Sequence, residues 1–526
     1  MLTISTPIGL QMGVTPAAIQ VKGINHKTPF PLIGRDLGGI NTLGRGQNVL
    51  LVGGNVELDG GGITLLTGRL QIAGLSEAGT ISLSGDGGFL SAALPEGLAR
   101  ADVSLSKGTE IFASGSGESV NIAARHLTLS SEPRGRQNNQ TAILAGALPG
   151  LPSPDQTGDI NIDAVGDVRL IDSNIYSAIA AGAIRNAGDL NLNARSLYLT
   201  ASAQIGAVGQ GTGNSGNLNI EVADSILLDG KNSRADRLTG LYSLVGGLVS
   251  GTGSGQAGDL NIKTSSLDML NGSLISSSTL GEGNAGNTTI VANERILVDG
   301  VNSVSGVASS ISSSVEFSAK GDGGSIDITT PVLVIAKGGT ILGRTQGDGN
   351  AGTILLKVNA LEANNGGQVV TTSSTAGDAG NIEIFARDRI QLEGRDATYQ
   401  DRVAITLFNA LGGESSGIYA NTNELSTGAS GNIILQTNQL ALSDTEQISA
   451  SSQGTGVAGG LDITAEKVQL NSATTQAESR NGDRGNIRIA TPILLLRDRS
   501  QITTNATTSA TSGNKRLPST ATALTR

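Results

Sequence analysis

The sequence predicts an all-β protein: a single-stranded, right-handed parallel β-helix (solenoid) with three strands per coil and about 28 residues per coil. Three observations predict this fold class. The 526 residues include 75 glycines, no tryptophan and only 2% aromatic residues, although 38% are hydrophobic. This composition is too apolar for a disordered chain and indicates a narrow core of small aliphatic side chains. A glycine motif also recurs at a near-constant interval, and no helical pattern separates its copies.

The repeated unit begins at a glycine that is followed by apolar residues at the second and fourth places. In the segment 188–193, Leu190 and Leu192 alternate with asparagines, as in a half-buried strand. The fourth place holds Ile or Leu in all eleven units, and the first place holds Asn or Asp in eight. Most intervals are 26–30 residues, and the exceptions are 38, 42 and 51. The eleven glycines are Gly158, Gly188, Gly216, Gly258, Gly286, Gly324, Gly352, Gly380, Gly431, Gly459 and Gly485.

Two further strands follow within each unit. Residues 196–199 form a second apolar alternation, residues 204–205 begin a third after a short polar turn, and a loop rich in Gly, Ser and Thr leads to the next glycine. We expect each strand to pair with the same strand of the neighbouring coil, about 4.8 Å away. The usual crossover preference makes the coil right-handed. Leucine-rich repeats and propeller blades require other lengths and patterns.

Asparagine occupies the third place after the glycine in four consecutive units. This place lies between two inward-facing residues, so its side chain points outward. In register, the four amides would form a ladder that hydrogen-bonds along the stack; the alternative is an ordinary polar surface. The four residues are Asn161, Asn191, Asn219 and Asn261.

The quality of the repeat divides the chain into four segments. Residues 1–78 merge into the β-helix, residues 79–157 form irregular coils, and residues 158–513 form regular coils. After Asn514 the expected alternation gives way to Lys-Arg-Leu-Pro, so residues 514–526 are expected to be a non-helical or truncated tail. Uncapped coils would expose strand edges, which could associate end to end.

Three units are lengthened at the same point. Each insertion follows a strand that ends in an acidic residue and glycine, so we expect all three on one edge of the coil stack. They lie near 231–240, 301–308 and 395–415, and the third contains Tyr399 and Phe408. Such an edge is either a binding surface or tolerated variation in loop length.

Charge and composition exclude several classes of function. The net charge is −10 with no basic block, which argues against nucleic-acid binding. The absence of cysteine excludes disulfides and thiolate metal sites. No run of 18 apolar residues predicts a membrane-spanning helix, and the N-terminal residues lack the pattern of a signal peptide.

No residues are predicted to be catalytic, cofactor-binding or metal-binding, and no cofactor is expected. His26 and His126 are about 100 residues apart, with no ligand spacing around them. The GDGG segments at 85–88 and 321–324 lack the repeated calcium-binding nonapeptide. We therefore expect a non-enzymatic protein. The alternative is a carbohydrate-active β-helix enzyme, a polysaccharide lyase or hydrolase, which would need three or more carboxylates in one groove. Asp163, Glu221 and Asp327 do not form such a cluster: Asp163 and Glu221 hold the fifth place of units that are not adjacent, and Asp327 holds the third.

The coils resemble those of the filamentous-haemagglutinin-type exoproteins of two-partner secretion, and cyanobacterial members in particular. The segments that carry this resemblance are GNAGNTTI, AGDLNLNARSLYLTASAQI, SGNIILQTNQLALSDTEQISASSQGTG and RGNIRIATPILLLRDRSQITTNAT. Residues 50–74, after 5–13, resemble the end of that family's secretion domain, and the similarity spans about 1–514. The family's early Asn-Pro-Asn-Gly-Ile-like stretch is missing, so the chain resembles a fragment that lacks most of the secretion domain.

The resemblance implies a secreted or cell-surface protein that passes through a dedicated outer-membrane transporter. It would act as an adhesin or structural rod and contact surface glycans or cells, without nucleic-acid partners or a membrane span.

Overall fold

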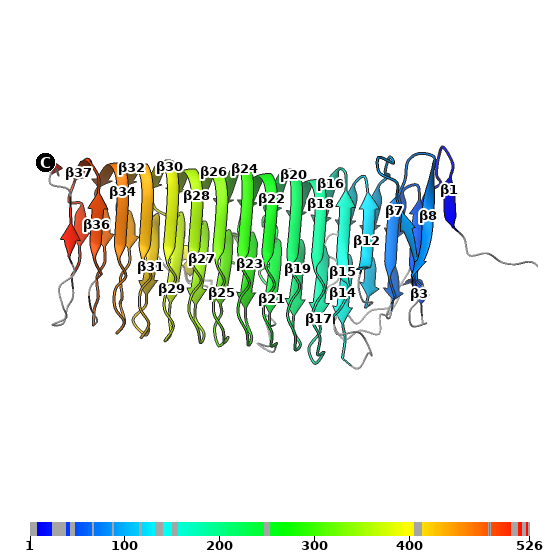
Figure 1. Cartoon of the computed structure of the whole chain (residues 1–526), viewed down its shortest axis with the longest axis horizontal. Coiled ribbons are helices and arrows are strands. Elements are labelled where there is room, and N and C mark those ends of the chain that lie inside the picture. The colour runs from blue at the N-terminus through cyan, green and yellow to red at the C-terminus, as the bar shows by residue number, and fades with distance from the viewer. Residues whose placement is uncertain are drawn as a thin grey trace, which may run out of the picture. The chain divides into compact units, whose positions relative to one another are not determined.

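A computed structural model describes residues 8–23, 38–42, 48–65, 68–86, 89–114, 118–131, 140–149, 156–246, 253–403, 413–481, 483, 485–505, 514–517 and 522–523. His26, Phe408 and residues 87–88 of the first GDGG segment lie outside them. The regular secondary structure of the described residues consists of strands, apart from the five-residue helix α1 (Tyr399–Val403). The chain divides into two units, Met1–Asp224 and Ser225–Arg526, and each contains stacked parallel coils, as predicted (Figure 1).

The first unit has three strand faces. The coil formed by β15 (Asp159–Ala164), β16 (Asp167–Ile171) and β17 (Asn174–Ile179) shows the pattern of one strand on each face. Each strand pairs in parallel with its equivalent in the adjacent coils. The first face also contains β4 (Val49–Gly53), β7 (Leu70–Gly74) and β12 (Glu118–Ala124). The second face also contains β2 (Ile19–Lys22), β5 (Val56–Asp59), β10 (Val103–Ser106) and β13 (Leu127–Ser130). The third face also contains β3 (Gly38–Thr42), β6 (Gly61–Leu65), β11 (Glu110–Ala113), β14 (Ala142–Ala147) and β19 (Gln204–Gly209).

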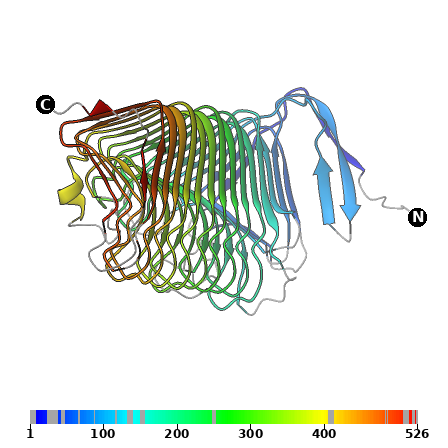
Figure 2. The same ribbon diagram turned by 60° about the vertical axis from the view of Figure 1, so that its left-hand side comes forward.

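Residues near the N-terminus already belong to coils. β2 pairs with β5 from Ile19 onward, so parallel stacking begins well within the segment 1–78. A separate antiparallel sheet contains β1 (Gly9–Met12), β8 (Gly79–Asp86) and β9 (Phe89–Ala93) (Figure 2). Its buried Ile81 and Ala92 pack with Leu50 and Val52 of β4, which covers the apolar side chains of that coil.

In later coils the first two expected strands form one bent strand, such as β18 (Leu190–Thr200) in the first unit. In β30 (Ile382–Glu393) the inward residues Ile384 and Ala386 are followed by three exposed residues before Ile390. The pairing register shifts at this corner, but the ladder continues on both sides. The chain therefore turns from one face to the next without ending the strand, because an irregularity in the pleat makes the corner.

The second unit repeats this two-strand coil. The long strands are β22 (Leu260–Leu270), β24 (Thr288–Asp299), β26 (Ile326–Ala336), β28 (Ile354–Asn364), β30, β32 (Ile433–Ser443) and β34 (Leu461–Asn471), and β20 (Leu218–Asp229) contains the boundary between the units. The short strands are β21 (Gly240–Val245), β23 (Leu274–Thr279), β25 (Ser310–Val315), β27 (Thr340–Thr345), β29 (Gln368–Ser373), β31 (Gly417–Thr422), β33 (Gln447–Ser449), β35 (Thr474–Gln476) and β38 (Gln501–Thr503).

The end of the chain adds to the ladder. Residues 485–497 form the separate strands β36 (Ile487–Ala490) and β37 (Ile493–Arg497). β39 (Lys515–Arg516) pairs in parallel with β36, and β40 (Thr522–Ala523) pairs with β37. The segment 514–526 therefore contributes two short strands to a further coil, although its sequence lacks the apolar alternation. Backbone pairing does not require that alternation, because every residue except proline carries both hydrogen-bonding groups.

The fourth-place Ile and Leu residues form the predicted core column. In the second unit each is paired in register with the next and is no more than 2% exposed. Burying one such side chain contributes roughly 1.5–3 kcal/mol before the loss of chain entropy. The column comprises Ile262, Ile290, Ile328, Leu356, Ile384, Leu435, Ile463 and Ile489.

The glycine and the Asx residue of the motif have different structural roles. A Cβ atom on Gly352 would lie 1.9 Å from the carbonyl oxygen of Gly324 in the preceding coil, so only glycine allows this approach. The following Asx side chain joins successive coils: the backbone N–H of Asn287 donates to Asp259 Oδ1 at 2.8 Å, and that of Ser325 donates to Asn287 Oδ1 at 2.9 Å. The motif therefore sets both the spacing and the register of the coils.

The outward asparagine ladder forms in the first unit. Asn191 Nδ2 donates to Asn161 Oδ1 at 2.8 Å, and Asn219 Nδ2 donates to Asn191 Oδ1 at 2.9 Å. Asn161 in turn donates to Asn121 at 2.9 Å, which extends the ladder one coil further than predicted. Asn261 belongs to the second unit, where its partner in the next coil is Thr289.

Candidate functional site

The acidic residues considered in the sequence lie apart and serve structural contacts. Asp163 forms an ion pair with Arg100 at 2.6 Å, and Asp327 pairs with Lys357 at 2.9 Å in the next coil. Glu221 is exposed on β20. In the second GDGG segment, Asp322 accepts the backbone N–H of Asn350 at 2.8 Å. Asp163, Asp327 and Asp322 thus each serve a separate structural contact.

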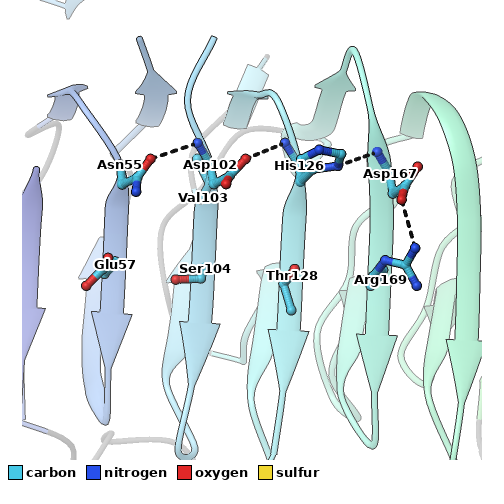
Figure 3. A pocket seen from close by; sticks show the side chains of 9 residues that line it. All are labelled: Asn55, Glu57, Asp102, Val103, Ser104, His126, Thr128, Asp167 and Arg169. Atoms are coloured by element: carbon cyan, nitrogen blue, oxygen red, sulfur yellow. Dashed lines mark hydrogen bonds and ion pairs between the residues drawn. The ribbon is translucent and has the colours of Figure 1, made fainter. Parts of the chain in front are cut away.

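The first unit has an open concavity of about 530 Å³ on its second strand face, the face formed by β5, β10, β13 and β16 (Figure 3). Four successive coils contribute to it, so its long dimension crosses the strands. Its walls are mostly polar, which suits a hydrogen-bonding ligand better than an apolar one. The lining residues are Asn55, Glu57, Asp102, Val103, Ser104, His126, Thr128, Asp167 and Arg169.

A continuous hydrogen-bonded column forms the upper wall in Figure 3. The N–H of Asp102 donates to Asn55 Oδ1 at 3.2 Å, and the N–H of His126 donates to Asp102 Oδ1 at 3.2 Å. The N–H of Asp167 then donates to His126 Nδ1 at 2.9 Å, and Arg169 Nη2 donates to Asp167 Oδ2 at 2.8 Å. Asn55, Asp102 and His126 directly precede β5, β10 and β13, and Asp167 is the first residue of β16. The coil register therefore aligns these four residues.

Two carboxylates in this wall are held ionised by arginines. Asp102 accepts from Arg125 Nε at 2.8 Å and from Nη2 at 2.6 Å, and this hydrogen bonding is the main cause that lowers the pKa of Asp102. Burial raises the pKa of Asp167, but hydrogen bonds from Arg169 and Arg195 outweigh it, and the net pKa is lowered. Both groups can accept hydrogen bonds, but neither is suited to give a proton to a leaving group at neutral pH.

His126 is held as part of the wall. Because Nδ1 accepts a backbone N–H, the neutral ring carries its proton on Nε2. Asp102 contacts the backbone N–H of His126 instead of its ring, so the two residues do not form a catalytic dyad. The ring lies against Gly166, where an added Cβ would be 2.5 Å from His126 Cε1. Glycine at 166 therefore creates the space that the imidazole occupies.

The floor of the concavity is a second column, one side chain from each coil. Glu57, Ser104, Thr128 and Arg169 are paired in register on β5, β10, β13 and β16. At one end Gln20 donates to Glu57 at 3.0 Å, and at the other the guanidinium of Arg169 lies 4.1 Å from the ring centroid of Tyr198. Donors and acceptors are thus arranged along the stack at the strand spacing, about 4.8 Å.

Sequence reasoning missed this concavity. Its wall residues 55, 102, 126 and 167 are separated by 47, 24 and 41 residues, so no constant interval relates them. The usable signal is the alternation that follows each one: Val-x-Leu at 56–58, 103–105 and 168–170, and Leu-x-Leu at 127–129. Aligning these four alternations would have placed Glu57, Asp102 and Asp167 near one another.

In the second unit, the three insertions lie along one edge. Each is closed by an antiparallel bridge: Arg234 with Arg237, Val301 with Ala308, and Arg395 with Ser415. They all leave the coil after its long strand, which explains their common position. This placement agrees with the position expected from the sequence.

Neighbouring parts of this edge touch one another. Asn302 of the second insertion donates through Nδ2 to the carbonyl oxygen of Gly230 at 2.9 Å. A Cβ on Gly338 would lie 2.9 Å from Asp396 of the third insertion and 3.2 Å from Val301 of the second. Within the third insertion, Arg402 Nε donates to Asp396 Oδ2 at 2.6 Å, and both side chains are about 95% buried, at 6% and 4% exposure.

The described part of the chain shows no group of three His, Asp or Glu side chains that could hold a metal ion. It also contains no helix with the length and hydrophobicity that a bilayer crossing requires. The fold and these surfaces define a parallel β-helical repeat protein. Comparisons with protein-family models, curated proteins and solved structures found no match.

Proposed function

We propose that the protein is a non-catalytic β-helical adhesin or structural scaffold of the filamentous-haemagglutinin type, acting outside the cell. The observation that carries the proposal is that polar side chains link successive coils. At repeating positions they bond one coil to the next, as in the ladder from Asn121 to Asn219. Stacked coils supply a regular surface, and the stability of such an array grows with each added coil.

The concavity of the first unit is the best candidate for ligand contact. It is open and polar, and its Glu57, Thr128 and Arg169 offer both acceptors and donors. An oligosaccharide lying across the coils would meet these groups in succession. The test is a glycan array probed with the purified chain, with Arg169→Ala as the concavity variant. Arg488→Ala, which removes an exposed ion pair in the second unit, is the matched control. The proposed contact predicts loss of glycan signal only for the first variant.

A carbohydrate-active enzyme remains the second candidate, favoured by one specific observation: Glu57, Asp102 and Asp167 line the same concavity. Against it, two of these carboxylates are bound by arginines and have lowered pKa values, which leaves them ionised. The test is incubation with neutral and acidic polysaccharides, followed by assays for reducing ends and unsaturated products. Turnover that is abolished by Asp102→Asn and Asp167→Asn would establish the enzyme and refute the adhesin proposal.

Export through an outer-membrane two-partner secretion transporter is the third part of the proposal. It rests on the resemblance of the coils to that family. Antibodies against the chain should label intact cells of the source organism as strongly as permeabilised cells. Labelling only after permeabilisation would contradict a surface location. Deletion of the cognate transporter gene should remove the surface signal while the intracellular signal increases.

A further inference from the structure

Glu446 is a buried carboxyl group in a column that otherwise holds small residues. It precedes β33 in the second unit, at the place occupied in adjacent coils by Ser416, Ala473 and Ser500. Its side chain is fully buried, and neither carboxyl oxygen has a hydrogen-bond partner among the residues that the structure describes. Because the side chain is removed from water, ionising its carboxyl group would cost free energy.

The serines of this column show what the position requires. Ser416 Oγ donates to the carbonyl oxygen of Glu393 at 2.8 Å and accepts the N–H of Gly366 at 2.9 Å. Ser309 does the same with Asp299 and Gly272, at 2.8 and 2.9 Å. A protonated carboxyl group has an O–H that can donate as these hydroxyls do, whereas a carboxylate can only accept. The neutral form of Glu446 therefore matches the hydrogen-bonding character of the serines in this column.

The turn before Glu446 is strained and contacts the base of the third insertion. Asp444 and Thr445 both have left-handed backbone angles, with φ of 68° and 79°. At the second of these positions the turns at 271–272, 337–338 and 365–366 place a glycine, whereas Thr445 is β-branched. Arg395 Nε donates to Thr445 Oγ1 at 2.8 Å, and the hydroxyls of Ser415 and Thr445 are 3.4 Å apart. Arg395 and Ser415 are the bridge pair that closes the insertion.

The charged and titratable groups around Glu446 come from three elements. They are Arg395 and Glu414 of the insertion base, Asp444 of the preceding turn, and Tyr419 of β31. Burial, and then the charge of Asp444, raises the pKa of Glu446 to about 7; the nearby amides of Glu446 and Gly394 and the charge of Arg395 oppose this in part.

We propose that Glu446 is a pH-sensitive latch for the edge that carries the third insertion. In its neutral form it allows the turn 444–446 to pack under Arg395 and Ser415. When ionised, it draws water into the column, and the turn and the insertion base open together. The latch is closed under acidic conditions and opens as the pH rises through the titration of Glu446. This inference does not depend on the proposed function.

Hydrogen exchange of the full chain, followed by mass spectrometry from pH 5 to 8.5, tests the latch. Protection is corrected for the intrinsic pH dependence of exchange and compared for peptides that cover 394–400, 413–422 and 443–452. In the native chain we expect protection in these peptides to fall about tenfold or more across this range, while peptides from β22 and β24 keep theirs. Glu446→Gln should remove this dependence.

Two further variants keep the test decisive. Glu446→Ser introduces the residue found at 416 and should be well folded and independent of pH. Asp444→Asn removes the neighbouring charge and should retain the dependence with its midpoint at lower pH. Three results would each overturn the proposal. They are protection that stays constant with pH in the native chain, an unchanged pH dependence of protection in both Glu446 variants, and complete loss of the pH dependence in Asp444→Asn.

Discussion

The hydroxyl of Tyr419 donates to the carbonyl oxygen of Ser415 at 3.3 Å, tying β31 to the last residue of the third insertion. The same arrangement follows the first insertion, where Tyr242 donates to Leu238 at 3.0 Å. In both places a glycine lies two residues before the tyrosine. A Cβ on Gly417 would be 2.4 Å from Tyr419 Cζ, and one on Gly240 would be 2.9 Å from Tyr242 Cζ. The Gly-x-Tyr triplet therefore anchors an insertion where it rejoins the coil.

This arrangement predicts that Gly417→Ala destabilises the insertion, because the new methyl group occupies the space of the Tyr419 ring. We expect a cost of about 1–3 kcal/mol, typical of overpacking at a buried site. Tyr419→Phe removes only the hydroxyl contact and should cost about 0.5–1.5 kcal/mol. Thermolysin cleavage near 413–417 provides the measurement. The double variant Gly417→Ala/Tyr419→Ala should show less than the sum of the single effects, and strict additivity would contradict the contact.

Removing the middle of the asparagine ladder should weaken the first unit. Asn191→Ala deletes one bond given to Asn161 and one received from Asn219, at an expected cost of about 1–3 kcal/mol. Asn193→Ala, two residues along the same strand and exposed, is the control. Hydrogen exchange in peptides covering 157–165 and 188–195 should accelerate for the first variant alone. Equal behaviour of the two variants would mean that the ladder is only a polar surface.

The buried ion pair between Asp396 and Arg402 predicts a larger effect. Arg402→Met leaves the Asp396 carboxylate buried without its cation, which should destabilise the insertion by about 3–5 kcal/mol. The double variant Asp396→Asn/Arg402→Met should recover part of this loss, since the uncompensated charge is gone. Arg480→Met breaks an exposed pair with Glu424 and should have almost no effect. Protection of amides in 394–403 distinguishes these outcomes.

Acid should destabilise the first unit through its paired aspartates. Hydrogen bonds from Lys107 and Arg125 are the main causes that lower the pKa values of Asp59 and Asp102 below 3.8, and the arginines beside Asp167 lower its pKa too. A lowered folded-state pKa contributes stability above the unfolded value, which is lost as the pH falls through the folded one. Melting temperatures should therefore decrease below pH 4.

Circular dichroism melts of the full chain between pH 5 and 2.5 measure this decrease. Asp102→Asn should lower the melting temperature at pH 5. Between pH 5 and 2.5 its melting temperature should then decrease less than that of the native chain, because the amide that replaces the Asp102 carboxylate has no charge to lose. Glu96→Gln, in an exposed turn, should follow the native profile. A native melting temperature that stays constant down to pH 2.5 would contradict the role assigned to these ion pairs.

The local residue pattern was enough to predict the coil, its repeat length, the inward Ile and Leu column, and the common edge of the three insertions. It could do so because each coil meets the same partners as the coil before it, so a local pattern such as Gly-Asp-Leu-x-Leu at 188–192 specifies a repeated tertiary contact. The asparagine ladder from Asn161 to Asn219 followed from the same register.

Contacts between coils of unequal length became visible in the three-dimensional structure alone. The column of Asn55, Asp102, His126 and Asp167 arises from coils of different length, and no sequence interval reveals it. The merging of two strands into one depends on how the pleat accommodates the corner, as at 387–389. Burial of Glu446 likewise arises from the turn and insertion packed around it. In each case the stabilising contacts come from side chains in other coils. The spacing of residues along the sequence does not predict which of those side chains lie close together.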